Sequence, residues 1–423
     1  MDKIFVQFAE HFIPAFNGER PEDVTGISRV PITFLSNGFS HVYDECKNIG
    51  DFFWADLDPC KMEESKLPIS KGEVFVSCFY PKHVFQAFYW ANSYSNLKIT
   101  IGGPAVRNHL RGFPRTKIPK NIEIKAGMAE NELFGKNIHN RTWHLDPPKK
   151  MLNYSIFSYT INRECYWKNC IFCGTRWKGL KKDPFQNTLD SLVVPEDKRR
   201  RWKIWLVTPC LRPTFIASEF PKVSGYNREN YTFSTHIRAD KAIVSALEST
   251  LSKCFLENEN LPFDFRVGVE FPSERMLEII RKGTTTEMML KTIKTIVRYN
   301  CRLRISLIIG WNILTMNDVE EVRTFAQRVR DIVGDKKIGA SIYYLVGGLK
   351  GKRVARNPVF EANKAKYRLV QLYGDSLFRY QGYIPILSKK QKELNRLVRN
   401  IYEENFDAFF YRPSLIEEML EEK

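Results

Sequence analysis

The sequence predicts an α/β protein with a parallel sheet or partial barrel in its middle, a small strand-helix-strand unit before it and a helical region after it. Two observations favour this class. From about residue 150 short apolar segments alternate with segments of helical periodicity, and residues 74 to 103 form one such unit by themselves. The chain has 423 residues, 43% of them hydrophobic, which suffices for a large buried core.

The N-terminal unit is expected to be a βαβ fold. Residues 74–79 have the composition of a buried strand and residues 83–95 that of a helix, and residues 97–102 form a second strand that ends in the glycine pair Gly102-Gly103. The glycine pair is consistent with a plain turn and also with a turn that approaches a ligand. A loop rich in Asn, His and Pro follows, and 146–148 (Asp-Pro-Pro) is the expected linker.

Six strands are expected in the middle of the chain, several of them with a helix behind. The strands are residues 154–161, 203–207, 231–235, 264–270, 303–309 and 339–345. Thr284 with Glu287 forms a capping-box pattern before one helix, and Thr315 with Asp318 opens another. The apolar faces of these two helices are Met289, Ile293, Ile296 and Val297, and Val319, Val322, Ala326 and Val329. Ligands of such a sheet collect at the carboxyl ends of its strands.

Three cysteines, Cys165, Cys170 and Cys173, lie close together directly after the first of these strands. Four residues separate the first pair and two the second. Because the chain has nine cysteines, an odd number unevenly spread, a reducing compartment is expected rather than a disulfide framework. Three thiolates at this spacing can hold a cubane iron-sulfur cluster and leave its fourth iron open. A zinc site completed by Cys210 or a histidine is the alternative.

These motifs resemble the radical S-adenosylmethionine (SAM) superfamily, whose partial (β/α)6 barrel carries a cluster-binding loop after its first strand. The stretch 268–283 resembles the fourth strand and following helix of the subgroup that has an N-terminal cobalamin-binding domain. Residues 306–310 resemble the fifth strand of that subgroup, and residues 236–240 the end of its third. The resemblance covers roughly residues 150 to 345.

The resemblance implies three domains. They are a degenerate, Rossmann-like, cobalamin-binding-like domain at 1–148, a radical SAM barrel at 149–350 and a helical C-terminal region at 351–423. The chain departs from the family pattern at two points. Its cysteine spacing is four then two, where the family has three then two, and its N-terminal region lacks the Asp-x-His-x-x-Gly sequence that supplies the axial histidine of cobalamin. Cobalamin bound without a histidine, and a domain recruited for substrate binding, both remain open.

The resemblance also implies roles for single residues. Cys165, Cys170 and Cys173 would hold a 4Fe-4S cluster, and SAM would chelate the open iron and be cleaved to a 5'-deoxyadenosyl radical that abstracts hydrogen from carbon. The residues expected to contact SAM are Phe172, near the adenine, Arg238 and Glu270, at its polar parts, and Gly310, which lets the fifth strand approach closely. Arg238 and Glu270 are also consistent with a surface ion pair.

Cys210 is a candidate hydrogen donor. It follows the second predicted barrel strand, on the same side as the cluster loop, where a thiol would be placed to return a hydrogen atom to a substrate radical. Burial as a small apolar side chain is the alternative for it, as for the other single cysteines.

The favoured reaction after hydrogen abstraction is modification of a ribosomally made peptide, such as epimerisation. Cobalamin-dependent C-methylation is the first alternative, and a catalytically silent iron-sulfur or zinc protein is the second. The formal charge of +17 suits a peptide with an acidic leader or a solvated basic face, and nucleic acid is not expected because no RNA-binding signature is present. An electron donor of flavodoxin or ferredoxin type is implied. Because no apolar run reaches the length of a signal or membrane span, a cytoplasmic protein is expected.

Overall fold

The structure is a computed structural model in which two compact units can be described. The described residues are 2–12, 30–32, 46, 49–56, 66–78, 81–103, 106, 117–125, 156–160, 165–173, 202–208, 210–223, 231–254, 263–334, 338–345, 367–371, 381–410 and 420–421. The first unit comprises Met1–Thr160, Leu180–Trp202 and Gln371–Tyr380, and the second comprises Ile161–Gly179, Lys203–Val370 and Gln381–Lys423. The predicted domain boundaries at 148 and 350, and the predicted linker at 146–148, lie outside the described residues.

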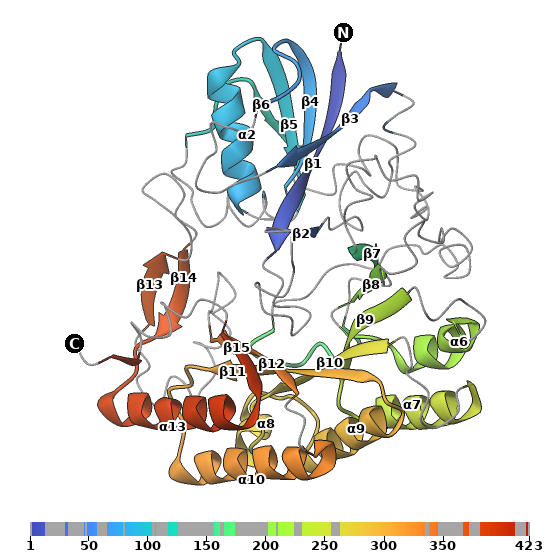
Figure 1. Cartoon of the computed structure of the whole chain (residues 1–423). Helices are drawn as coiled ribbons and strands as arrows, with labels where there is room; N and C mark the ends of the chain where they lie inside the picture. Colours follow the sequence, from blue (N-terminus) through green and yellow to red (C-terminus); the bar gives the residue numbers. More distant parts are fainter. Residues whose placement is uncertain are drawn as a thin grey trace. The chain divides into compact units, whose positions relative to one another are not determined.

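The first unit contains a six-stranded sheet (Figure 1). Its elements are β1 (Lys3–Phe12), β2 (Val30–Ile32), β3 (Asp51–Asp56), β4 (Gly72–Ser77), α2 (Pro81–Ser93), β5 (Leu97–Gly102) and β6 (Ile122–Ile124). The short strand β2 pairs antiparallel with β1, whereas β3, β1, β4, β5 and β6 follow one another in parallel. Apart from β2, this order is the doubly wound, flavodoxin-like one, in which the chain changes direction between the first and third strands. The predicted βαβ unit is β4, α2 and β5.

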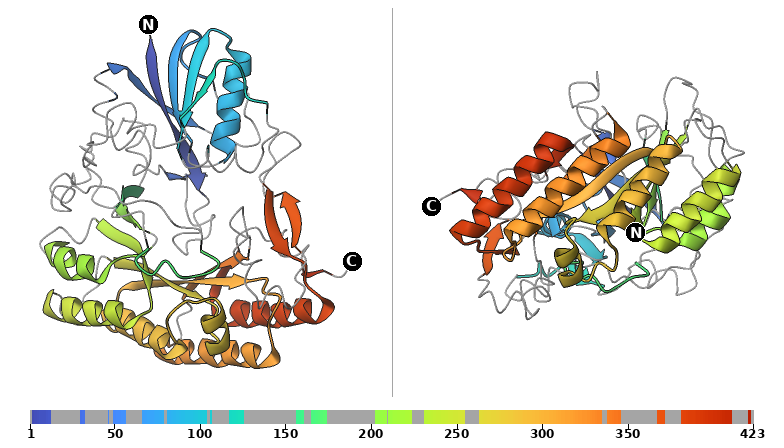
Figure 2. Two further views of the ribbon diagram at one scale, coloured as in Figure 1. Left: turned by 180° about the vertical axis from the view of Figure 1, so that it is seen from behind. Right: turned by 90° about the horizontal axis from the view of Figure 1, so that it is seen from below.

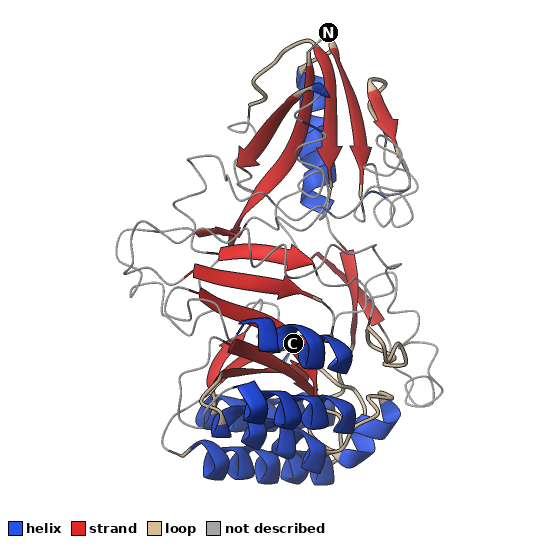
Figure 3. Ribbon diagram, turned by 90° about the vertical axis from the view of Figure 1, so that its right-hand side faces the viewer, coloured by secondary structure: helices blue, strands red, loops and turns tan. Residues whose placement is uncertain are grey.

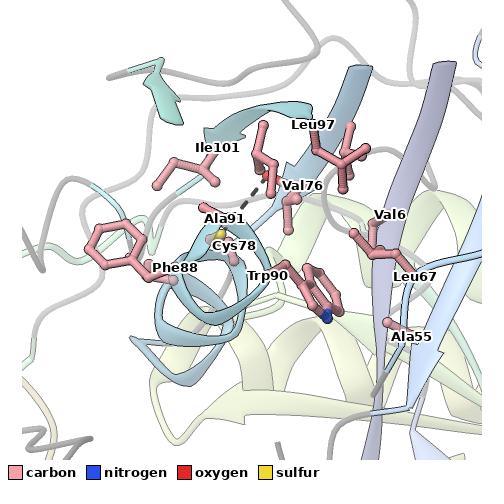
Figure 4. Packing of buried hydrophobic residues seen from close by; sticks show 14 of the residues in the cluster. Val6, Ala55, Leu67, Val76, Cys78, Phe88, Trp90, Ala91, Leu97 and Ile101 are labelled. Carbon is pink, nitrogen blue, oxygen red and sulfur yellow. Dashed lines mark hydrogen bonds between the residues drawn. The ribbon is translucent and has the colours of Figure 1, made fainter. Parts of the chain in front are cut away.

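Alternating apolar residues of β4 and β5 pack against α2 and form the core of this unit (Figure 4). Trp90 of α2 is fully buried and stacks on Phe8 of β1 with 5.6 Å between the ring centroids. Cys78 is buried as a small apolar side chain, and its thiol points back to the Val76 carbonyl oxygen at 3.9 Å. Gly103 has φ +102°, and a Cβ there would lie 2.6 Å from the Cys78 carbonyl oxygen, so this turn requires glycine.

The second sheet has the order β15-β12-β11-β10-β9-β8-β7. Its strands are β7 (Ile156–Thr160), β8 (Trp202–Val207), β9 (Tyr231–Arg238), β10 (Phe263–Glu270), β11 (Arg302–Ile309), β12 (Gly339–Tyr344) and β15 (Asp407–Phe410). The first six are the six predicted strands, and the pairs from β9 to β15 are parallel. The strand predicted at 231–235 extends to Arg238, because its final residues remain paired with β10.

Helices of the second unit gather on one face of this sheet (Figure 3). They are α6 (Pro213–Val223), α7 (Lys241–Cys254), α8 (Glu274–Ile279), α9 (Thr286–Arg298), α10 (Met316–Val333) and α13 (Lys389–Asn405). Figure 2 shows α7, α9, α10 and α13 side by side when the unit is seen from below. The region after residue 350 contains the strands β13 (Tyr367–Gln371), β14 (Gln381–Pro385) and β15 in addition to the predicted helix. Within the described part of the chain, no helix has the length and apolar character of a membrane span.

One of the two predicted helix starts is confirmed and the other is shifted by a residue. Thr315 and Asp318 form the predicted capping box of α10. At α9 the prediction of Thr284 as the cap was wrong, because Thr285 is the N-cap and accepts from the Met288 N–H at 3.2 Å. Thr284 instead donates its hydroxyl hydrogen to the Ala239 carbonyl oxygen after β9.

The loops after β10 and β11 are tied together by the buried carboxylate of Asp318. Besides the Thr315 N–H at 2.7 Å, it accepts from the Ser273 hydroxyl at 2.6 Å and from Nε of Arg275 at 3.1 Å. Burial raises the pKa of Asp318, but the hydrogen bonds from Arg275, Ser273 and Thr315 outweigh it and hold the pKa below its usual value. The folded state therefore depends on the ionised form of this carboxyl.

The C-terminal helix α13 holds the loop after β11 from the other side. The Asn395 amide is fully buried, and its oxygen accepts from the backbone N–H of Gly310 at 2.7 Å and of Trp311 at 3.2 Å. One turn earlier, Gln391 exchanges two hydrogen bonds with the backbone of Leu314, both at 2.9 Å. A segment about 80 residues away in sequence thus fixes the carboxyl end of β11.

The Asp318 network should contribute to stability in a pH-dependent way. Asp318→Asn should lower the free energy of unfolding by about 3 kcal/mol at neutral pH, because Arg275 loses its anion and buried hydrogen bonds are broken. The lowered folded-state pKa stabilises the protein above the ordinary Asp pKa, and this stabilisation is lost as pH falls through the folded pKa. The difference from the unchanged protein should therefore shrink in acid, as measured by urea unfolding at several pH values.

Asp331→Asn is the matched control on the same helix, since Asp331 is exposed and accepts from Gln327 at 3.0 Å. It should change the free energy of unfolding by no more than about 0.5 kcal/mol. Equal stability of the two variants at neutral pH would contradict the role given to Asp318.

Candidate metal centre

The cysteine loop 165–173 lies against the turn that follows α8. The backbone N–H of Ile171 donates to the Ile280 carbonyl oxygen at 3.1 Å, and the Trp167 indole N–H donates to the Arg281 carbonyl oxygen at 2.8 Å. Gly283 has φ +64°, and a Cβ there would lie 1.9 Å from the Trp167 ring. Only glycine at this position lets the indole pack on the turn.

Arg238, the last residue of β9, reaches from the strand end into this loop. Its side chain is 5% exposed, and Nη1 donates to the Cys170 sulfur at 3.8 Å. Nε donates to Oδ2 of Asp240 at 3.2 Å, and Nη2 donates to the Lys282 carbonyl oxygen. The guanidinium carbon lies 4.8 Å from the Trp167 ring centroid, within the range of a cation–π contact.

Asp240 anchors the same loop a second time. It accepts a hydrogen bond from the Tyr166 hydroxyl, and its other carboxylate oxygen accepts from the Ile243 N–H at 3.0 Å in the first turn of α7. Burial, together with the negative charges around it, raises the pKa of Tyr166. The phenol therefore stays protonated and remains a donor to Asp240.

A buried ion pair lies at the end of the neighbouring strand. Nζ of Lys282 is 2.7 Å from Oε1 of Glu270, and the two side chains are 6% and 15% exposed. The same ammonium lies 5.7 Å from the Phe172 ring centroid. Glu270 has φ +68° at an irregularity in the register of β10, and a Cβ on Gly268 would lie 2.8 Å from its carboxylate. Strained backbone of this kind is concentrated at functional sites.

Cys165 and Cys170 experience different electrostatic surroundings. A hydrogen bond from the Cys210 thiol, helped by backbone N–H groups of the loop, outweighs burial and lowers the pKa of Cys165 to about 5. Burial raises the pKa of Cys170, while the nearby positive charges of Lys282 and Arg238 act in the opposite direction. The lowered pKa favours the thiolate form of Cys165, the form that binds metal.

Cys210 lies beside Cys165 in this arrangement. It is 1% exposed, and its sulfur lies 3.6 Å from the Leu211 carbonyl oxygen. Burial and the neighbouring Cys165 raise the pKa of Cys210, so it remains a thiol. The buried position is the one expected for a small apolar side chain, and the role of hydrogen donor stays a prediction.

Gly310 and Trp311 follow β11 directly, and Trp311 contacts Phe172 of the cysteine loop. The Phe172 and Trp311 rings pack edge to face with 6.3 Å between their centroids. Gly310 has φ +90°, and a Cβ there would lie 2.3 Å from the Tyr344 ring. The space left by the missing side chain of Gly310 is thus filled by a tyrosine of β12. The expected close approach to SAM at Gly310 stays a prediction.

The fold brings the predicted residues to one end of the second sheet. Arg238, Glu270 and Gly310 stand at the carboxyl ends of β9, β10 and β11, and the first two lie close to Cys170. Two of them are buried in ion pairs, Arg238 with Asp240 and Glu270 with Lys282, rather than in the surface pair that was the alternative.

Three cysteines on one loop, with two buried cations beside them, suit an iron-sulfur cluster by their chemistry. Sulfur ligands are those that such clusters require, and Arg238 and Lys282 offset the negative charge that thiolates and cluster would bring. Within the described ranges, the side chains of His, Cys, Asp and Glu form no group of three or more already placed around a metal ion. The assignment of Cys165, Cys170 and Cys173 as ligands therefore rests on donor chemistry and position in the fold.

Several residues of the site were missed by sequence reasoning. Asp240 and Lys282 lie inside the stretches that resemble the family, but only their contacts reveal their partners. Asn395 had no sequence signal, since it lies on α13 and binds the backbone after β11, far away in the sequence. Asn312, after β11, is 7% exposed, and neither polar atom of its side chain has a hydrogen-bond partner among the described residues. A buried amide in this condition is available to a ligand or to water.

No protein-family model and no curated protein sequence matches the chain. Solved structures are similar to it in fold. OxsB, a cobalamin-dependent S-adenosylmethionine radical enzyme with aqua-cobalamin and SAM bound, has a TM-score of 0.59 at 11% identity, covering 94% of this chain and 66% of that chain. The chain thus spans slightly less than two thirds of the length of OxsB.

TsrM from Kitasatospora setae, a radical SAM methyltransferase, is similar in two structures. With tryptophan and a SAM analogue bound it has a TM-score of 0.56 at 11% identity, over 95% of this chain and 89% of that chain. With cobalamin and a [4Fe-4S] cluster bound it has a TM-score of 0.50 at 12% identity, over 81% and 75%. These similarities confirm the expected architecture: the chain has the α/β fold of cobalamin-dependent radical SAM enzymes.

Proposed function

We propose that this protein is a radical SAM enzyme of the cobalamin-dependent class. The observation that carries the proposal is the cysteine loop, held by Arg238 and lying beside the Glu270–Lys282 pair at the carboxyl ends of parallel strands. Ligands of parallel α/β sheets bind at this end. The similarity in fold to OxsB and TsrM supports the same assignment.

In this proposal Cys165, Cys170 and Cys173 hold a 4Fe-4S cluster that, with SAM, supplies a carbon radical when both are bound. The protein's part is to keep the three sulfurs on one ordered loop. Trp167, Tyr166 and Arg238 order the loop through contacts made within the protein itself.

Three residues in or beside the cysteine loop are proposed to contact SAM. Phe172 would contact the adenine, and Glu270 the positively charged amino group. Lys282, which already balances Glu270 at 2.7 Å, would be available to the SAM carboxylate. An ion pair of opposite charges is complementary to the zwitterion of an amino acid, so each partner would exchange one internal contact for one with the ligand.

We propose cobalamin as a further cofactor, bound by the first unit. The parallel strand order β3-β1-β4-β5-β6 has its change of direction between β1 and β4, and ligands of doubly wound folds bind there. OxsB and TsrM both have structures with cobalamin bound. His83 of α2 is buried and stacks on Phe8 with 4.2 Å between the ring centroids, an arrangement typical of a core residue. Among the described residues of the first unit, His83 is thus placed as a core residue rather than as a ligand of cobalamin, and the proposed reaction is transfer of a methyl group to carbon.

Modification of a peptide, such as epimerisation, is the second candidate. It is favoured by Cys210, whose thiol stays protonated next to Cys165 and would supply the hydrogen atom that completes an epimerisation. A peptide substrate with an acidic leader would suit the net charge of +17. Either reaction would take its electron from a protein of flavodoxin or ferredoxin type. A catalytically silent metal protein is the candidate with least support.

Reconstitution under anaerobic conditions should load about four irons per chain. Cys170→Ala should lose most of this iron and the cleavage of SAM, because one of three protein ligands is removed. Iron and sulfide analysis, with chromatography of 5'-deoxyadenosine, gives the readout. Cys301→Ala is the matched control, since Cys301 is buried before β11 and should leave the iron content unchanged. Bound zinc without SAM cleavage would contradict the proposal.

Protein produced with the vitamin supplied should contain a stoichiometric amount of cobalamin, visible in its absorption spectrum. With SAM labelled in its methyl group, transfer of that group by way of bound cobalamin would place the label on the cofactor. Mass spectrometry of the extracted cofactor measures the label.

The opposite outcome would favour the peptide candidate. No bound cobalamin, together with one deuterium taken up per product in heavy water, would contradict methyl transfer. Cys210→Ala should then abolish the deuterium uptake while SAM cleavage continues, and Cys301→Ala should preserve both.

A further inference from the structure

We infer that Arg238 acts on the cluster rather than on SAM: its guanidinium donates to the sulfur of Cys170 and raises the reduction potential of the cluster. This inference rests on the proposed function, since it needs a 4Fe-4S cluster on the cysteine loop. It gives Arg238 a positioning role that differs from the SAM contact implied by the family resemblance.

All three nitrogens of the guanidinium already have partners within the protein. Nη1 is 3.8 Å from the Cys170 sulfur, Nε is 3.2 Å from Asp240, and Nη2 donates to the Lys282 carbonyl oxygen, with the Gly283 carbonyl oxygen at 3.4 Å. One face of the planar group lies against Trp167. Because each of its nitrogens is bound in this way, the planar guanidinium is held against the cysteine loop.

The charge of Arg238 is placed to act on Cys170 at short range. The residue is 4% exposed, so water screens its field weakly. Both cations near Cys170 are paired with a carboxylate, Lys282 with Glu270 at 2.7 Å and Arg238 with Asp240 at 3.2 Å. Of these two cations, Arg238 is the one with a hydrogen bond to the sulfur.

A cation that donates to a cluster ligand favours the more negative, reduced state. Reduction adds one electron to the cluster and makes no bond to the protein, so the extra negative charge is shared with the cysteine sulfurs. Hydrogen bonds to these sulfurs and the local net charge are the terms by which proteins set cluster potentials. Arg238 therefore makes the cluster easier to reduce before SAM is cleaved.

The test is a redox titration of the full chain with its cluster loaded and without SAM, followed by electron paramagnetic resonance. In Arg238→Gln the ratio of reduced to oxidised cluster at a fixed potential should fall about tenfold, a shift of about 59 mV to more negative values for one electron. Arg266→Gln is the matched control, because Arg266 is a buried arginine of β10 that donates to the Tyr343 hydroxyl at 3.5 Å. It should leave the potential unchanged.

Asp240→Asn provides a second variant with the opposite expectation. It removes the anion beside Arg238 and keeps an oxygen for the Ile243 cap, so the potential should move to more positive values. This variant decides the question if Arg238→Gln fails to fold or to hold iron. Opposite shifts in the two variants, with SAM affinity within about twofold of the unchanged protein, would support the inference, since a positive charge is removed in one and a negative charge in the other.

Two results would overturn the inference in distinguishable ways. If the unchanged protein loads four irons per chain and neither variant shifts the potential, the role of Arg238 fails while the proposed function stands. A large loss of SAM affinity in Arg238→Gln, with the reduction potential unchanged, would show that Arg238 binds SAM instead. If the unchanged protein binds no iron-sulfur cluster, the proposed function fails and the inference fails with it.

Discussion

The guanidinium of Arg238 is the contact on which the candidate site depends. It joins the end of β9, the cysteine loop, the turn at 282–283 and the start of α7 through one buried, charged group. A buried arginine is tolerated only when its donors are satisfied, so each of these segments must be in place for the charge to be stable. The same requirement orders the loop before any cofactor binds.

The loops on the other side of the site are fixed by two further buried polar groups. Asp318 ties the residues after β10 to those after β11, and Asn395 of α13 binds the backbone at Gly310 and Trp311. Each group satisfies backbone donors that would otherwise be buried without partners. The C-terminal helix is therefore a structural part of the site, although it contributes no cysteine or SAM contact.

The local features of this fold could be predicted because they depend on short sequence patterns. The six strands follow from runs of apolar residues, and the capping box at Thr315 and Asp318 depends on residues three apart. The start of α9 was displaced by one residue because the Thr284 hydroxyl is bound by Ala239 from another strand end. The partners of Cys210, Arg238 and Lys282 could not be predicted, since they come from segments far apart in sequence.

The sequence by itself determined the α/β class, the position of three cysteines after the first strand of the second sheet, and the strand ends that carry Arg238, Glu270 and Gly310. These depend on composition and spacing along the chain. The tertiary structure decided which charges face one another, that Cys210 is buried beside Cys165, and that Tyr344 fills the space at Gly310. Such contacts depend on the register and packing of strands, which only the folded chain specifies.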